Sequence, residues 1–327
     1  MALGIIVTIV VCTLLSAGIW YLAIPALTLA SCGLAWMLFG VSLVFSLGFL
    51  VLKFITDDWG KTTGVLWAIT GGVLLFIIVV SLIGSPIFNY LPYRDAIVVS
   101  EYDFDQDFEN VSNGDASLLD LDTARRLGDR VLGNVPNAPW YEVSGEYNLI
   151  VYNKKQYRIS PLEYRDFTTY FKASGVGIPG YVLVSVDEME AEFVQTNPIK
   201  YSPSGMFGQN LRRHLRSQFP SVVFDASFME VDDQGTPYWV TATLEAHAGL
   251  WGAHIANGFV LTNACTGESQ WYRLIDKPEW VDHVFSLGYL MERVDWHYNY
   301  VRGWWNISHT DVLRTTYSYR SGYNKET

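Results

Sequence analysis

Three long apolar runs fill most of the first 90 residues and constrain the fold more than any other feature of the chain. Leu3 to Leu27, Gly33 to Leu52 and Thr62 to Phe88 contain no Asp, Glu, Lys, Arg or His. A run of about 18 or more such residues is long enough to cross the hydrocarbon core of a bilayer as a helix. The runs therefore predict three transmembrane helices and fix the protein at a membrane.

The start of the first run helps to decide whether the run is a retained helix or a cleaved signal peptide. The opening Met-Ala-Leu-Gly carries no positive charge, and the apolar stretch is longer than the apolar region of a typical signal peptide. Two further apolar runs follow it. We therefore interpret all three runs as retained helices.

Charge is concentrated in the rest of the chain. Of the 33 acidic and 22 basic residues, only five precede Asp95, namely Lys53, Asp57, Asp58, Lys61 and Arg94. The polar domain is thus strongly acidic, which argues against nucleic acid as a partner, because phosphate binding requires patches of Lys and Arg. The same excess argues against tight docking of the domain onto anionic lipid headgroups.

The loop lysines predict the orientation in the membrane. Lys53 and Lys61 lie between the second and third runs, and the positive-inside tendency places that loop in the cytoplasm. The N-terminus is then cytoplasmic and the polar domain extracytoplasmic, in a multi-pass protein of the cell membrane. No acidic or basic side chain lies within the runs, so they show no proton relay or charged-substrate site and are interpreted as an anchor or assembly element.

The remaining pattern divides the chain into four segments. Residues 1–93 are the three-helix anchor, 94–139 an acidic linker and helix, 140–220 a first α+β repeat region, and 221–327 a second one. The alternating carboxylates of 103–109 lack the Gly and Glu of an EF-hand loop, which favours a solvated linker over a calcium site.

Turn residues and periodicity predict the individual elements. The expected strands are Ala96–Ser100 and the paired strands within 147–159 and 227–244. The expected helices are 120–132, Leu162–Ala173, Ser204–Phe219 and Pro278–Arg293.

An internal repeat is the second most informative feature. Gly180–Val194 aligns without a gap to Gly258–Tyr272, and both read as strand, tight turn and a strand that ends in aromatic residues. A helical segment is expected after each copy. Strand pairs followed by helices predict an α+β domain of antiparallel sheets with helices packed on one face.

The residues of the second copy carry a family resemblance. Gly235–Leu244 and Gly258–Tyr272, with a turn at Thr266-Gly267-Glu268, resemble a PepSY-type unit, a small α+β module of bacterial envelope proteins. The first copy has Glu188-Met189-Glu190 at the position of that turn. The whole chain is also similar to multi-pass membrane proteins of Gram-positive bacteria that are loosely described as CvpA-like. This resemblance implies a location in the envelope more than a chemistry.

Sequence motifs of catalysis and metal binding are missing. The chain has no Gly-x-Ser-x-Gly elbow and no phosphate-binding Gly-rich loop, and Cys265 is interpreted as a passive turn residue. His247 and His254 flank the loop Gly249–Gly252, but Glu245 is the only further ligand nearby, which favours a solvated loop. We predict no catalytic, cofactor or metal site.

Two side-chain clusters remain as candidates for partner binding. A basic cluster at 212–216 is expected to pair with surface carboxylates, with an anion or partner site as the alternative. The aromatic stretch 296–305 is expected to pack the sheet against its helices, with a sugar or peptide platform as the alternative. The candidate partner-binding residues are Arg212, Arg213, Arg216, Trp296, Trp304 and Trp305.

These observations predict a non-catalytic, membrane-anchored interaction or assembly module of the bacterial envelope. Its expected partners are the lipid bilayer and an envelope protein or peptide, in a homo- or hetero-oligomer. One alternative is an envelope hydrolase of peptides or glycans whose carboxylates converge only in the folded protein, and another is an accessory subunit of a larger membrane complex. The strand-like end leaves open a continuation beyond Thr327.

Overall fold

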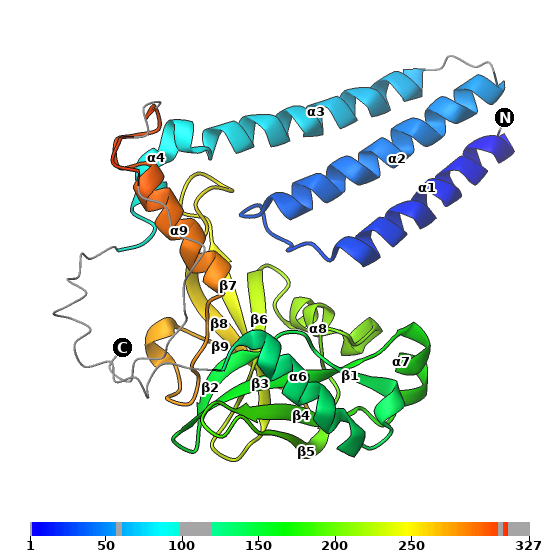
Figure 1. Ribbon diagram of the computed structural model, residues 1–327. Helices are drawn as coiled ribbons and strands as arrows, with labels where there is room; N and C mark the ends of the chain where they lie inside the picture. The colour runs from blue at the N-terminus through cyan, green and yellow to red at the C-terminus, as the bar shows by residue number, and fades with distance from the viewer. Residues whose placement is uncertain (1, 57–60, 99–118, 307–309, 313–327) are drawn as a thin grey trace.

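Three apolar helices form one end of the molecule. The computed structural model describes residues 2–56, 61–98, 119–306 and 310–312. Helices α1 (Ala2–Ala23), α2 (Cys32–Thr56) and α3 (Lys61–Ile83) are each long and apolar enough to cross a membrane, as the apolar runs predict. They lie side by side with α2 in the middle (Figure 1), in contact with both neighbours.

The first and third apolar runs extend beyond the helices that they predict. The first helix ends at Ala23, because Pro25 lacks the N–H that would continue the helical hydrogen bonding. The third ends at Ile83, and Gly84 and Ser85 separate it from a short helix α4 (Pro86–Arg94) that leads toward the polar domain.

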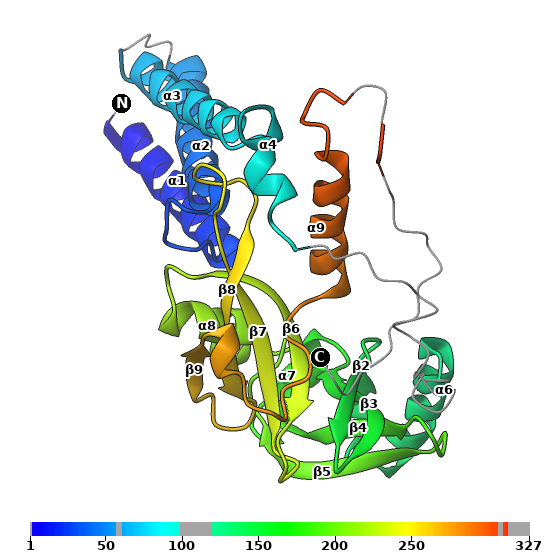
Figure 2. The ribbon, with the colours of Figure 1, turned by 90° about the vertical axis from the view of Figure 1, so that its left-hand side faces the viewer.

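The polar domain contains two antiparallel sheets (Figure 2). In the first, the strand order is β1 (Tyr141–Val143), β3 (Lys155–Tyr164), β4 (Ile178–Ser185) and β5 (Ala191–Ile199), and β2 (Asn148–Tyr152) also pairs with β3. In the second, the strands follow chain order as β6 (Val223–Val231), β7 (Pro237–Glu245), β8 (Ile255–Asn263) and β9 (Ser269–Tyr272). The α+β class and the antiparallel strand pairs within 147–159 and 227–244 are thus confirmed.

The main core lies between the two sheets and beneath helix α6 (Leu121–Val131). The buried cluster draws on both sheets and on that helix, and includes Ala124, Ile159, Val182, Leu183, Met229, Val231, Trp239 and Val260. Tyr181 of β4 crosses to the second sheet, where its hydroxyl donates to the carbonyl of Gly235 at 3.0 Å. Helix α6 contacts β4 and β5, and a short helix α7 (Phe167–Ala173) contacts β3.

The aligned segments 180–194 and 258–272 are both β-hairpins, β4–β5 and β8–β9. A Cβ on Gly180 would lie 2.0 Å from the carbonyl oxygen of Val194, and a Cβ on Gly258 would lie 2.4 Å from that of Tyr272. The two glycines therefore allow the same close approach at aligned positions. A shared origin of the two copies stays a prediction.

Three helices predicted in the domain begin later than expected. Strand β3 continues through Pro161 to Tyr164, and α7 begins only where the Asp166 side chain accepts the N–H of Thr169. Helix α8 (Leu211–Gln218) begins after Asn210, whose side chain accepts the N–H of Arg213. The last helix, α9 (Leu287–Asn299), is capped by Ser286. In each case a polar capping residue marks the true start.

Residues 278–286 form an irregular segment along the second sheet. The predicted helix is therefore wrong over these residues. Val281 and Val284 bury their side chains against the face formed by Val240, Ala242 and Phe259. The strand predicted at 96–100 is also wrong for residues 96–98, which form a turn and bend after α4. Residues 99–118, which include the rest of that strand and most of the predicted acidic linker, lie outside the described residues.

A buried carboxylate holds this irregular segment in place. Glu230 of β6 has no exposed surface, and its carboxylate accepts the backbone N–H of His283 at 2.9 Å and of Asp282 at 3.4 Å. The His283 Nδ1 atom lies 3.6 Å from the same carboxylate. The Asp282 carboxylate in turn accepts the N–H of Val151 in β2, at 2.6 Å. The segment thereby links both sheets.

The pKa values of this pair are both displaced upward. Burial raises the pKa of Glu230 above its ordinary value of 4.5, against the opposing effect of His283. Burial alone would lower the pKa of His283, but the Glu230 carboxylate outweighs it and raises this pKa above 6.5. The folded state therefore holds both protons more tightly than the unfolded chain does.

We expect the contribution of this pair to the free energy of unfolding to decrease as the pH rises. A group with a raised folded-state pKa stabilises fully below its unfolded value and loses that effect as the pH passes through the folded value. The His283 part is thus complete below 6.5 and is lost above it. Urea unfolding in detergent across this range should show a smaller decrease for His283→Gln than for the native protein. Parallel pH profiles for the two would contradict the assignment.

Candidate functional site

The loop between β7 and β8, residues 246–254, reaches the membrane helices. Ala248, Gly252 and Ala253 are buried whereas His247, Gly249 and Leu250 are exposed, so the loop predicted to be solvated is solvated only in part. The indole N–H of Trp251 donates to the carbonyl of Leu29 between α1 and α2, at 2.8 Å. The same indole packs edge-on against Phe76 of α3, with ring centroids 5.9 Å apart. The loop therefore docks the domain onto the helices.

Three glycines allow this docking. A Cβ on Gly252 would lie 2.0 Å from the carbonyl oxygen of Gly84, just beyond α3, and 2.7 Å from that of Ala248. Gly249 has a φ of +59°, and a Cβ added there would lie 3.1 Å from the Cα of Gly84. Only residues without a side chain fit where these two backbone segments meet.

Helix α9 makes the second connection, to α4. The rings of Trp296 and Tyr93 lie 4.8 Å apart in an edge-to-face arrangement, and the Tyr93 hydroxyl donates to the carbonyl of Gly84 at 2.9 Å. The His297 Nδ1 atom lies 2.9 Å from the carbonyl oxygen of Arg94. Trp296 thus packs a helix against a helix at the membrane end, in place of the sheet contact that the aromatic pattern predicts.

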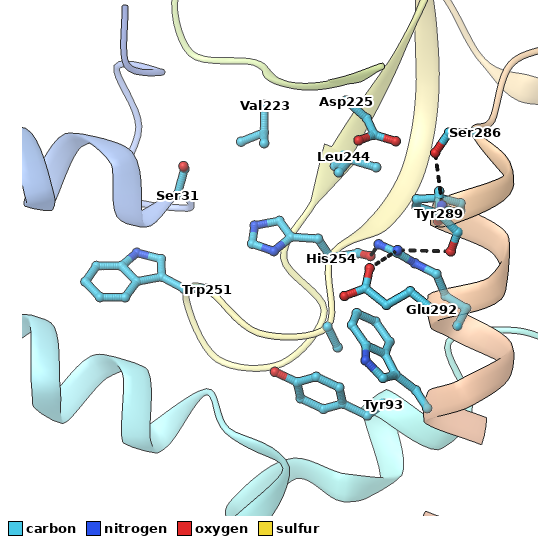
Figure 3. Close-up of a pocket in the computed structure, with 14 residues that line it drawn as sticks. Ser31, Tyr93, Val223, Asp225, Leu244, Trp251, His254, Ser286, Tyr289 and Glu292 are labelled. Carbon is cyan, nitrogen blue, oxygen red and sulfur yellow. Dashed lines mark hydrogen bonds and ion pairs between the residues drawn. The ribbon is translucent and has the colours of Figure 1, made fainter. Parts of the chain in front are cut away.

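A pocket of about 570 Å³ lies between these contacts (Figure 3). Its wall combines the connection between α1 and α2, helix α4, strands β6 and β7, the β7–β8 loop and helix α9. The polar and aromatic lining includes Ser31, Tyr93, Asp225, Trp251, His254, Glu292, Arg293 and Trp296. We call it the junction pocket, because the membrane helices and the domain both contribute to it.

Arg293 is the buried cation of the junction pocket. Its side chain is 4% exposed and its guanidinium stacks between Tyr289, at 3.5 Å from the ring centroid, and Trp296, at 4.7 Å. One terminal nitrogen donates to the Glu292 carboxylate at 2.6 Å, and the other donates to the carbonyl of His254. The buried Nε has no hydrogen-bond partner among the residues that the structure describes.

Asp225 supplies an unpaired acceptor in the same pocket. The pairing of β6 with β7 shifts register between Phe224 and Ser227, and Asp225 lies in this irregularity. Such bulges redirect a side chain that would otherwise follow the alternation of the strand. Its buried Oδ2 accepts no hydrogen bond from any residue in the described part of the chain. Two buried polar atoms of pocket-lining residues, one donor and one acceptor, are thus left without a partner among the described residues.

The predicted basic cluster lies elsewhere, on α8. Arg213 lies over the ring of Tyr21 at the end of α1, 3.7 Å from its centroid, and donates to the Tyr21 carbonyl at 2.6 Å. Arg216 donates to three backbone carbonyls just beyond its own helix, those of Phe219, Pro220 and Val222, and lies over the Phe224 ring. Across the described residues no ion pair joins Arg212, Arg213 or Arg216 to a carboxylate. The expected pairing with surface carboxylates is therefore replaced by aromatic and backbone contacts.

The six predicted partner-binding residues do not form one site. Trp296 lines the junction pocket, whereas Arg213 and Arg216 line a separate hollow of about 420 Å³ beside Trp20 and Tyr21. Trp304 and Trp305 follow α9 as an exposed edge-to-face pair with ring centroids 4.7 Å apart.

Sequence reasoning missed Asp225, Trp251 and Arg293. A tryptophan in a connection made mostly of alanine and glycine was the available signal for Trp251. The sequence around Asp225 and Arg293 contains no pattern that would have identified them as pocket residues.

No protein-family model matches this chain, and no significant similarity to a curated protein or to a solved structure was found. The PepSY-like and CvpA-like relationships therefore stay predictions, and any function has to be argued from the junction pocket and the surfaces of the protein.

Proposed function

We propose that this protein is a membrane-anchored, extracytoplasmic interaction or assembly module of the bacterial envelope, and that its partner places a polar group in the junction pocket. The observation that carries the proposal is the pair of unsatisfied buried groups, Arg293 Nε and Asp225 Oδ2, in a pocket built by helices and domain together. A buried polar atom without a partner costs about 1–3 kcal/mol, and a ligand that satisfies it recovers that free energy.

The chemistry of the pocket favours a peptide or a peptide-like group. A backbone amide carries one acceptor for the Arg293 N–H and one donor for the Asp225 carboxylate. The aromatic rings of Trp251, Trp296 and Tyr93 line the same space and suit an apolar side chain of the partner. The volume falls within the range of about 300–1,000 Å³ that is typical of ligand sites.

The extracytoplasmic side is proposed from the ends of the helices. Lys53 and Lys61 lie at the end of the bundle that is remote from the domain, where the N-terminus also lies (Figure 1). The positive-inside tendency assigns that end to the cytoplasm and the domain to the outer face. The domain itself we propose to be a pair of PepSY-like repeats with helices on one face, which the matching glycine contacts of the two hairpins support.

A photoreactive diazirine side chain in place of Leu244, on the pocket wall, tests the proposal in intact cells. We expect it to capture a defined envelope protein or peptide. We expect Asp225→Asn to reduce the yield severalfold, because the side chain loses its charge and one of its two acceptor oxygens is replaced by a donor NH₂. The matched control carries the same group in place of Met189, an exposed residue in the β4–β5 turn. Equal capture from both positions, or unchanged yield with Asp225→Asn, would contradict the proposal. Added protease should remove the domain from intact cells.

The identity of the captured protein also separates the alternatives. Capture of one integral membrane protein in fixed ratio would favour an accessory subunit of a larger complex. An envelope hydrolase would require a free carboxylate in the pocket. Among the described lining residues only Asp225 could serve, because Arg293 binds Glu292 at 2.6 Å. We therefore place the hydrolase second.

A further inference from the structure

An exposed aromatic face lies on the domain outside the junction pocket. Phe167 and Phe171 of α7 and Phe207 of the short 3-10 helix η3 (Phe207–Gln209) are 59%, 54% and 51% exposed. The rings of Phe167 and Phe171 lie 4.8 Å apart, and those of Phe171 and Phe207 lie 6.1 Å apart. Contiguous apolar surface of this kind on a folded domain marks a contact with another apolar phase or molecule.

The fold holds these rings outward. Thr169, Tyr170 and Ala173 occupy the buried side of α7, so Phe167 and Phe171, four residues apart, share the outer side. The Tyr170 hydroxyl lies 3.0 Å from the carbonyl oxygen of Met206 and fixes η3 beside α7. Phe207 has a φ of +50°, a conformation that is costly for a bulky residue and persists only where the surroundings impose it.

This aromatic face is continuous with the membrane end of α1. Phe207 lines the same hollow as Trp20, Tyr21 and Ile24, and Arg213 stacks over Tyr21 at 3.7 Å. The N–H of Leu27, just beyond α1, donates to the carbonyl of Pro220 after α8 at 2.7 Å. Trp and Tyr at the end of a transmembrane helix mark the depth of the lipid headgroups. Phe207 therefore lies beside that depth, and its ring contact with Phe171 connects it to the rest of the aromatic face.

We propose that Phe167, Phe171 and Phe207 insert into the headgroup region of the bilayer and hold the domain against the membrane surface. The apolar face of a helix that lies in the interface typically enters about 5–10 Å into the boundary between headgroups and acyl chains. Lys172, which follows Phe171 in α7, and Arg212 on α8 are both exposed, and such long basic side chains can reach lipid phosphates. The domain as a whole is acidic and would be repelled by anionic lipid, but this side of it is locally basic, because α8 carries three arginines and no carboxylate. This contact goes beyond the partner site proposed for the junction pocket.

The test uses the full chain in vesicles of phosphatidylcholine and phosphatidylglycerol. An environment-sensitive fluorophore is attached to Phe171→Cys in protein whose Cys32 and Cys265 are replaced by serine. We expect lipids with nitroxides near the headgroup to quench this label severalfold more strongly than the same label at Ile275→Cys. Ile275 is an 86% exposed apolar residue in the short orange helix on the opposite side of the domain (Figure 1).

Each outcome decides the proposal. Strong lipid quenching at 171 that falls with Phe167→Ser supports the membrane contact, because the neighbouring ring helps to hold position 171 in the interface. Equal quenching at 171 and 275 would overturn it. A blue-shifted emission at 171 without lipid quenching would also overturn it, since a second copy or another protein would then cover the face.

Discussion

Replacing Gly252 with alanine is expected to separate the domain from the membrane helices. The new methyl group would lie 2.0 Å from the carbonyl oxygen of Gly84 and 2.7 Å from that of Ala248. Both neighbours are backbone atoms, so neither can rotate away. Overpacking of this kind costs about 1–3 kcal/mol or more. We expect a loss of that size in the free energy of unfolding in detergent, with new protease cleavage in the β7–β8 loop.

Gly133→Ala is the matched control for this prediction. A Cβ on Gly133 meets no atom within 4 Å, so the same chemical change should leave the unfolding midpoint almost unchanged. If Gly252→Ala unfolded at the same denaturant concentration as Gly133→Ala and stayed resistant to protease, the close packing of the loop on α3 would be disproved.

Replacing Glu230 with leucine is expected to release residues 278–286 from the second sheet. The substitution keeps the approximate volume but removes the acceptor of the His283 and Asp282 N–H groups. Leaving such groups buried and unpaired costs about 1–3 kcal/mol each, so we expect a total loss of about 2–5 kcal/mol. Denaturant unfolding followed by tryptophan fluorescence measures this loss, and faster hydrogen exchange at 278–286 would locate it.

Glu230→Gln separates the hydrogen bonds from the charge. The amide oxygen of glutamine can still accept the N–H of His283, so we expect a loss of less than about 1.5 kcal/mol. The raised pKa of His283 should also disappear, because the neighbouring carboxylate is its cause. Equal losses for the leucine and glutamine variants would show that the backbone hydrogen bonds of Glu230 do not hold the segment.

Where local patterns are strong, the fold can be predicted from sequence. Charge-free runs of this length are almost always membrane-spanning helices. The strands at 147–159 and 227–244 show alternating apolar and polar residues on either side of turn residues. Asn153 and Lys154 adopt φ of 50° and 64°, as a two-residue hairpin turn requires. Tertiary contacts override weaker patterns. Residues 278–286 have helical spacing, but Val281 and Val284 contact a sheet face and Glu230 binds the backbone N–H groups there.

The candidate site could not be predicted in the same way, because it is assembled from segments more than 200 residues apart. Ser31 lines the same pocket as His254 and Arg293 only because the helices dock onto the domain. A glycine-rich loop gives the same sequence signal whether it is solvated or pressed against another backbone, as Gly252 is. The register shift that redirects Asp225 arises from the pairing of β6 with β7, and neither strand encodes it alone. Trp296 alone among the predicted binding residues lines the junction pocket.

The central claim is that the membrane helices and the domain form one docked body with the junction pocket between them. The most direct test is a distance measurement by pulsed electron spin resonance in vesicles, with nitroxides at Leu22→Cys in α1 and Ile275→Cys in the domain, both highly exposed positions. The native Cys32 and Cys265 are replaced by serine. We predict a single narrow distance distribution that broadens when Gly252→Ala is added. A broad distribution without that substitution would show that the domain moves independently of the helices and would contradict the account.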